Sequence, residues 1–305
     1  MNTQARWVEV HRLAVAGGEA EIARYMGELV SSVWLPRSRF ADVAALATAT
    51  LTLGPYAGAF FDLGRAQSAT GQHQLALASF EQALRLYREA ANRRNEAVTL
   101  NSIGVVYDRR GDGDRALAHY EQALLIKREV GDRAAEAATL CNIGGLYDMR
   151  GDGRRALAYY EQALPTQREV GDRPGEATTL NNIGAVYERL GDAEWALAYY
   201  ERALPIQREV GDRAAEAVTL SNIGAAYERL GDAERALAYY GQALPIRREV
   251  GDRPGEAVTL SNVGAVYSQL GDGERALAYY GQALPIRREV GDRPGEAVTL
   301  SNVGA

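Results

Sequence analysis

The residues of this chain that most often perform acid–base or nucleophilic chemistry are His11, His73, His119 and Cys141. Catalysis by histidine or cysteine requires a partner side chain that activates it. No histidine shares its sequence surroundings with another, and positions later in the chain that match His119 carry tyrosine. No signature of a nucleophile surrounds Cys141. We therefore predict no catalytic residue and no enzyme activity.

An acidic run at 111–114, with the sequence GDGD, raises the question of calcium binding. A calcium-binding helix–loop–helix needs oxygen ligands at alternating positions and a closing glutamate twelve residues in. Counting from Asp112 reaches Ala123, so the pattern fails. A helix stop followed by an N-cap explains the glycine and aspartate instead. We predict no metal site and no cofactor.

The most regular chemical feature is a series of amide side chains at a constant spacing of forty residues, at Asn182, Asn222, Asn262 and Asn302. An asparagine side chain offers two donors and an acceptor. The surrounding sequence repeats with the same period, and residues 241–265 and 281–305 are identical. Self-similarity at a period of this size indicates an array of structural repeats, in which each unit contacts its neighbours.

Residues 177–216 represent one unit. Its first part has apolar residues at helical spacing, at Leu180, Ile183, Val186, Tyr187 and Leu190. Gly191 should end this helix and Asp192 should cap the next, which carries Ala196, Leu197, Tyr200, Ala203, Leu204 and Ile206. The pattern predicts two helices of roughly 16–18 residues per unit, separated by Gly-Asp stops.

Two details of the unit carry structural predictions. Gly184 costs helix propensity, so we expect close packing against the partner helix near Ala196, with Tyr200 and its equivalents filling the space between the pair. Prolines stand inside the second helix at Pro165, Pro205, Pro245 and Pro285. Proline removes a backbone hydrogen bond, so we expect a kink at each, or a helix that ends early and restarts.

The pattern Leu180, Ile183-Gly184, Tyr187, Gly191, Ala196, Tyr200, Ala203 resembles the tetratricopeptide repeat (TPR) family. The long unit with Gly-Asp-Arg between repeats is similar to the repeats of kinesin light chains, of the mitotic adaptor Pins and of many bacterial regulators. The resemblance implies an all-α fold, a right-handed α-solenoid of antiparallel helix pairs. It also implies that the first helices line a concave face.

Counting the period divides the chain into three regions. Residues 1–56 should hold N-terminal helices at 5–16, 19–35 and 39–53, with a degenerate repeat whose core is Val30, Trp34, Phe40, Val43 and Leu51. Residues 57–296 form six TPR units of 40 residues, and residues 297–305 begin a truncated seventh unit. The absence of a polar cap indicates a fragment of a longer array or a covered end. It permits end-to-end self-association through the uncapped C-terminal repeat.

The resemblance places a partner-binding groove on the first helices, lined by Asn101, Asn142, Asn181, Asn182, Asn222, Asn262, Glu188, Arg189, Glu228 and Arg229. The asparagines could bond the backbone of an extended peptide, or they could bond a neighbouring helix or water. The sites used by chaperone-binding relatives to clamp a terminal carboxylate are uncharged here. Because acid is prominent among the mixed charges, the groove predicts ligands with some basic character.

The charge of the chain narrows its partners. A net charge of −6 argues against a nucleic-acid partner, which would need surplus positive charge. No segment reads as a signal peptide or a membrane span, and a single cysteine fits a reducing, cytoplasmic compartment. A row of arginines beside a row of glutamates indicates a solvated, mixed-charge face: Arg128, Arg168, Arg208, Arg248 and Arg288 beside Glu129 to Glu289.

The leading functional interpretation is a protein–protein interaction scaffold that binds a partner peptide or helix in the concave groove. It would form the sensing or recruiting arm of a larger bacterial signalling protein. One alternative is a receptor for short signalling peptides, which would bind short peptides in preference to long partners. Another is a self-assembling structural array, whose mass would rise with concentration.

Overall fold

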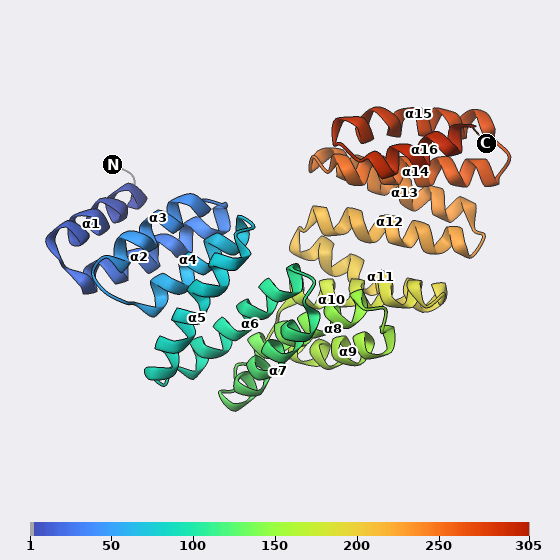
Figure 1. Cartoon of the computed structure of the whole chain (residues 1–305). Helices are drawn as coiled ribbons and strands as arrows, with labels where there is room; N and C mark the ends of the chain where they lie inside the picture. The colour runs from blue at the N-terminus through green and yellow to red at the C-terminus, as the bar shows by residue number, and fades with distance from the viewer. Residues whose placement is uncertain (1–2, 305) are drawn as a thin grey trace. The chain divides into compact units, whose positions relative to one another are not determined.

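The computed structural model describes residues 3–304, and this part of the chain contains sixteen α-helices, one 3-10 helix and no strand (Figure 1). The predicted all-α fold is confirmed. In order, the elements are α1 Thr3–Gly17, α2 Ala20–Trp34, η1 Leu35–Arg37, α3 Phe40–Leu51, α4 Ala57–Ala69, α5 His73–Glu89, α6 Arg93–Arg109, α7 Gly113–Glu129, α8 Arg133–Met149, α9 Gly153–Glu169, α10 Arg173–Arg189, α11 Ala193–Val210, α12 Arg213–Arg229, α13 Ala233–Glu249, α14 Arg253–Gln269, α15 Gly273–Glu289 and α16 Arg293–Gly304.

The helices gather into two compact units, with the boundary between Leu146 and Tyr147 inside α8. In the first unit the closest pairs are α4 with α5 and α6 with α7. In the second they are α10 with α11, α12 with α13 and α14 with α15. The first helices α10, α12 and α14 also contact one another in succession, so they share one face of the second unit (Figure 1).

The helix stops between α6 and α16 share one local geometry, which the α10–α11 turn illustrates. Gly191 has φ +86°, a left-handed conformation that favours glycine. The backbone N–H of Asp192 donates to the carbonyl of Tyr187 at 2.9 Å, a bond that closes the end of α10. The Asp192 carboxylate then accepts from the N–H of Trp195 at 3.2 Å and caps α11. The predicted stop and cap are confirmed.

The prolines do not interrupt their helices. Pro165 lies within α9 and Pro205 within α11, and both helices are continuous across them. The prediction of a helix that ends early and restarts is therefore wrong. Pro165 is exposed, and so is Glu161 four residues before it. The carbonyl that loses its backbone partner thus lies on a face where water can satisfy it.

The two helices of a pair meet at a glycine and a tyrosine. A Cβ added to Gly184 would lie 2.6 Å from Cε1 of Tyr200 and 3.1 Å from the carbonyl oxygen of Ala196. Tyr200 is fully buried, as are the equivalent side chains Phe80, Tyr120, Tyr160, Tyr240 and Tyr280. The predicted close approach is confirmed, and it depends on a position without a side chain facing a large one.

The N-terminal helices match the predicted ones closely. Val30, Trp34 and Val43 form a buried cluster, against which Phe40 packs. Leu51 is only half buried and lies outside this cluster, so its predicted place in the core is wrong. It is the last residue of α3, where the helix ends and the side chain has fewer neighbours to pack against.

Substitutions at two helical glycines should have opposite effects on stability. Gly184→Leu must displace Tyr200, so it should lower the free energy of unfolding by about 1–3 kcal/mol or more. Gly241 lies inside α13 with nothing within 4 Å of an added Cβ, so Gly241→Ala should raise that free energy by about 0.5–1 kcal/mol. Urea unfolding followed by circular dichroism measures both. An equal loss in the two variants would contradict the close-approach assignment.

Candidate partner-binding face

The predicted groove residues lie on first helices in both units. In the second unit Asn182, Asn222 and Asn262 stand at the same place on α10, α12 and α14, each half buried. We call the surface formed by these three helices around the asparagines the first-helix face. In the first unit Asn101 lies on α6 and Asn142 on α8.

Four of the predicted asparagines form hydrogen bonds between neighbouring first helices. Oδ1 of Asn181 accepts from Oγ1 of Thr219 at 2.9 Å and from Nδ2 of Asn222 at 3.3 Å. In the first unit Oδ1 of Asn101 accepts from Thr139 at 3.0 Å and from Asn142 at 3.3 Å. The neighbouring-helix alternative therefore describes the Asn101 and Asn181 carbonyls, which join successive first helices.

A buried residue of the second helix completes each of these two contacts. Nε2 of Gln207 donates to Thr219 at 2.9 Å, and Nζ of Lys127 donates to Thr139 at 2.5 Å. Each contact joins one residue of a first helix, one residue of the second helix of the same pair, and the threonine of the following first helix. We call these contacts the polar layer. Sequence reasoning missed it because a polar residue on a second helix usually indicates the solvent side.

The identity of the second-helix residue in the polar layer varies along the chain. Where the first helix carries serine, the second helix carries arginine, and Arg247 donates to Oγ of Ser221 at 3.2 Å. Where it carries asparagine, the second helix carries glutamine at 207 or lysine at 127. Oγ of Ser221 also lies 3.2 Å from Oγ1 of Thr259. The threonine therefore contacts the first-helix residue whether that residue is serine or asparagine. The joint appearance of serine and arginine at Ser221 with Arg247 and at Ser261 with Arg287 is the sequence signal that could have revealed the layer.

The predicted charged residues of the face also meet in pairs across successive first helices. Arg229 donates to the backbone carbonyl of Glu188 at 2.7 Å and lies 3.5 Å from its carboxylate. Arg189 pairs with the side-chain carboxylate of Asp148, and Gln269 donates to Glu228 at 3.1 Å. The acidic side chain thus always belongs to the preceding repeat.

The buried tyrosines donate hydrogen bonds to two of these carboxylates. The hydroxyl of Tyr200 donates to Glu188 at 2.8 Å, and that of Tyr240 donates to Glu228 at 3.0 Å. Burial, followed by the nearby carboxylate, raises the pKa of both tyrosines well above the usual value. The hydroxyls therefore stay protonated and serve as fixed donors beneath the face.

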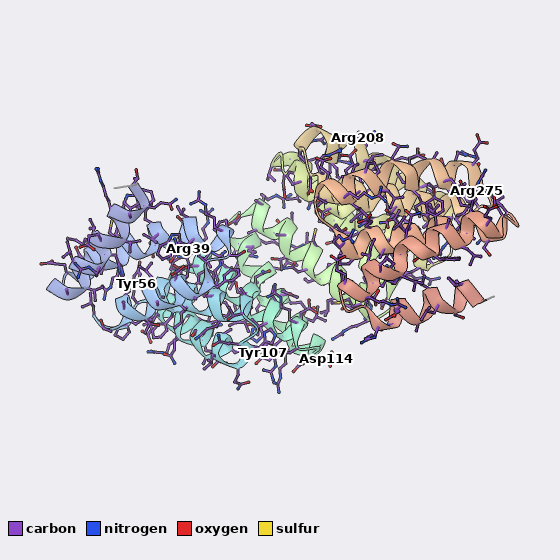
Figure 2. The ribbon with its side chains drawn as sticks, turned by 90° about the horizontal axis from the view of Figure 1, so that it is seen from above. Arg39, Tyr56, Tyr107, Asp114, Arg208 and Arg275 are labelled. Carbon is purple, nitrogen blue, oxygen red and sulfur yellow. The ribbon has the colours of Figure 1, made fainter. Side chains whose placement is uncertain are left out.

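The arginines of the row predicted on a solvated face also pair with buried glutamates. Nε of Arg208, which lies at the periphery of its unit in Figure 2, donates to Glu216 at 2.8 Å, and Arg213 donates to the other carboxylate oxygen. Glu216 is only 3 % exposed, whereas both arginines are close to half exposed. We call this contact of one glutamate with two arginines the glutamate pin. It recurs at Glu96, Glu136, Glu176, Glu256 and Glu296.

The histidines have structural surroundings. His11 is buried, its Nε2 lies 2.8 Å from Oγ1 of Thr50, and burial lowers its pKa. His119 stacks on Tyr107 with ring centroids 5.5 Å apart. Among residues 3–304, no group of three or more histidine, cysteine, aspartate or glutamate side chains could hold a metal ion. No helix in this described range is long and apolar enough to cross a membrane.

Replacing Lys127 by glutamine, the residue at the equivalent positions 167 and 207, should stabilise the first unit. Lys127 is 4 % exposed, and burial lowers its pKa from 10.5 to about 8. Keeping Lys127 charged at pH 7 therefore destabilises the folded chain. Between pH 8 and 10.5 the folded chain has lost this proton while the unfolded chain still holds it, so the free energy of unfolding should rise with pH over this range. Lys127→Gln should increase the free energy of unfolding by about 1–3 kcal/mol at pH 7, and this free energy should no longer rise between pH 8 and 10.5.

Urea midpoints measured from pH 7 to 11 check this prediction. Leu125→Gln, an exposed change on the same helix, should keep the pH dependence of the unaltered chain. A Lys127→Gln variant that still gains stability between pH 8 and 10.5 would show that another group causes the rise.

Comparison with known proteins agrees with this geometry. Residues 57–89, 92–169, 170–249 and 251–305 match the tetratricopeptide repeat family, which accounts for well over half of the chain. A comparison with curated proteins found no match.

Several solved structures share the fold. BtubC (BKLC) from P. vanneervenii is 26 % identical with a TM-score of 0.64, over 70 % of this chain and 91 % of that one. A signal transduction ATPase with numerous domains (STAND) and a TPR sensor, from Pyrococcus horikoshii, has a TM-score of 0.79 at 16 % identity, over 99 % of this chain and 46 % of that one. The chain thus spans less than half of the STAND protein.

The apo form of the quorum sensor NprR from B. thuringiensis has a TM-score of 0.72 at 19 % identity, over 93 % of this chain and 82 % of that one. At these identities the STAND and NprR matches concern the fold alone.

Proposed function

Since the chain belongs to the tetratricopeptide repeat family, whose members bind protein or peptide partners, we propose that its first-helix face binds a peptide or helix of a partner protein. In this proposal the chain is the recruiting or sensing arm of a larger cytoplasmic signalling protein. The likeness to a STAND protein with a TPR sensor supports that place.

The observation that carries the proposal is the repeated half-buried amide of Asn182, Asn222 and Asn262. The Asn222 side chain uses one amide hydrogen to bond Asn181. Its second hydrogen and its Oδ1 can meet the alternating N–H and C=O groups of an extended peptide. Such contacts bond the backbone, so they do not require one partner sequence.

The paired change Asn182→Ala and Asn222→Ala should weaken partner binding without unfolding the chain. Each lost hydrogen bond costs roughly 1 kcal/mol, so two predict a loss of about 30-fold in affinity. Affinity capture from the source organism would identify partners, and titration of a purified partner would measure the loss. The matched control is Gln162→Ala, since Gln162 is exposed on α9 and bonds the carbonyl of Ala158 in its own helix.

Circular dichroism and the urea midpoint separate a lost contact from a lost fold. A folded double variant that keeps the full affinity would overturn the assignment of the binding face. Asn181→Ala is the structural contrast, because Asn181 bonds Thr219 of the next first helix, and its loss should lower stability instead.

A receptor for short signalling peptides is the second candidate, and the shared fold of the quorum sensor NprR is the observation that favours it. The two functions differ in the length of ligand required. Titration with peptides of five to ten residues and with longer segments of a captured partner should show tighter binding of the longer segments to a scaffold. Full affinity for the short peptides would favour the receptor.

A further inference from the structure

One arginine of the first-helix series lacks the acidic side chain that its equivalents have. Arg189 and Arg229 each pair with a carboxylate on the preceding first helix, 41 residues earlier in the chain. The residue 41 positions before Arg109 is Ser68. Arg109 donates to its Oγ and its backbone oxygen at 3.5 Å, so a neutral hydroxyl stands where Glu188 stands for Arg229.

A second arginine faces the same place. Arg65, on α4, stands where the next repeat has Val105, and both residues line a hollow of about 230 Å³ together with Ser68 and Arg109. Within the described residues neither Arg65 nor Arg109 has a carboxylate oxygen within 4.0 Å. The guanidinium of Arg65 lies 5.9 Å from the ring centroid of Phe61.

The neighbouring acids Asp62 and Asp108 do not line the hollow. Asp62, one helical turn before Arg65, is largely buried and accepts a hydrogen bond from Ser31. Burial raises its pKa to about 6, and its side chain is not among those that line the hollow. The hollow therefore presents two guanidinium groups without a paired carboxylate.

Apart from Ser102, the rest of the hollow is lined by apolar side chains. Leu35 and Phe80 are buried in its wall, and Phe40 is half exposed beside them. A carboxylate held between two guanidinium groups forms charge-assisted hydrogen bonds, which are stronger than neutral ones. An apolar side chain next to that carboxylate would cover the aromatic wall and exclude water from the ion pair.

We propose that this hollow of the first unit binds a glutamate side chain of a partner peptide, with an aromatic or aliphatic residue beside it in the peptide sequence. The glutamate takes the position that Glu188 of this chain takes against Arg229. The inference rests on the proposed function and specifies which side chain of the partner peptide is bound. It reverses, for this unit, the expectation of basic ligands drawn from the charge pattern of the sequence.

The test uses the full chain and two fluorescein-labelled peptides with blocked ends, one containing Phe-Glu-Leu and the other Phe-Gln-Leu. Fluorescence anisotropy should show at least tenfold tighter binding of the glutamate peptide. Arg109→Gln should abolish this preference. Ser68→Glu should abolish it as well, because the new carboxylate would pair with Arg109 as Glu188 does with Arg229.

Arg85→Gln is the matched control and should leave the preference intact, because Arg85 is an exposed arginine of the same unit that pairs with Glu89 of its own helix and does not line the hollow. Equal binding of the two peptides by the unaltered chain would overturn the inference. So would a preference that survives both Arg109→Gln and Ser68→Glu in folded variants. A free-acid Phe-Gln-Leu peptide that binds as tightly as the blocked glutamate peptide would assign the hollow to a chain terminus and overturn the side-chain assignment.

The outcome separates this inference from the proposed function. Loss of partner binding in the Asn182→Ala/Asn222→Ala variant, together with no glutamate preference, would refute the hollow alone. A glutamate preference that persists while that double variant binds its partner fully would refute the asparagine face and keep the hollow.

Discussion

Successive helix pairs are held in register by the glutamate pin. Glu216 is buried at the start of α12 and receives one arginine from α11 and one from its own first turn. A buried carboxylate is costly unless it is paired, so the two helices must keep the positions that satisfy both of its oxygens. Arg213 extends the contact to Glu249 of α13 at 3.0 Å. The alignment of asparagines on the first-helix face depends on this fixed relation between one pair and the next.

The features that sequence predicted well are set by local chemistry. A glycine with positive φ followed by a capping aspartate produces the same turn at each helix stop from Gly111 to Gly291. The Gly184–Tyr200 contact was also predictable, because a glycine that recurs inside a helix weakens that helix unless a neighbour must approach closely there. Both arguments require only residues within one pair of helices.

The features that sequence missed depend on contacts between repeats. Asn181 and Asn182 are neighbours with the same chemistry, yet Asn181 accepts from Thr219 of the next first helix, a residue 38 positions away. Lys127 occupies a position that looks like a surface lysine until Thr139 is brought beside it. The absence of a carboxylate at Ser68 likewise has meaning only after Arg109 is placed next to it. Periodicity fixes the helices but not which side chains they bring together.

The composition of the polar layer bears on how such an array can lengthen. The two residues that vary together, Ser221 with Arg247, lie within one forty-residue block, whereas the third member, Thr259, comes from the following block and is the same residue in each one. A block copied in tandem therefore brings its matched pair with it and meets a threonine at the new junction. Gene duplication can add a unit here without creating a mispaired interface, and the identical segments 241–265 and 281–305 have the form that such copying leaves.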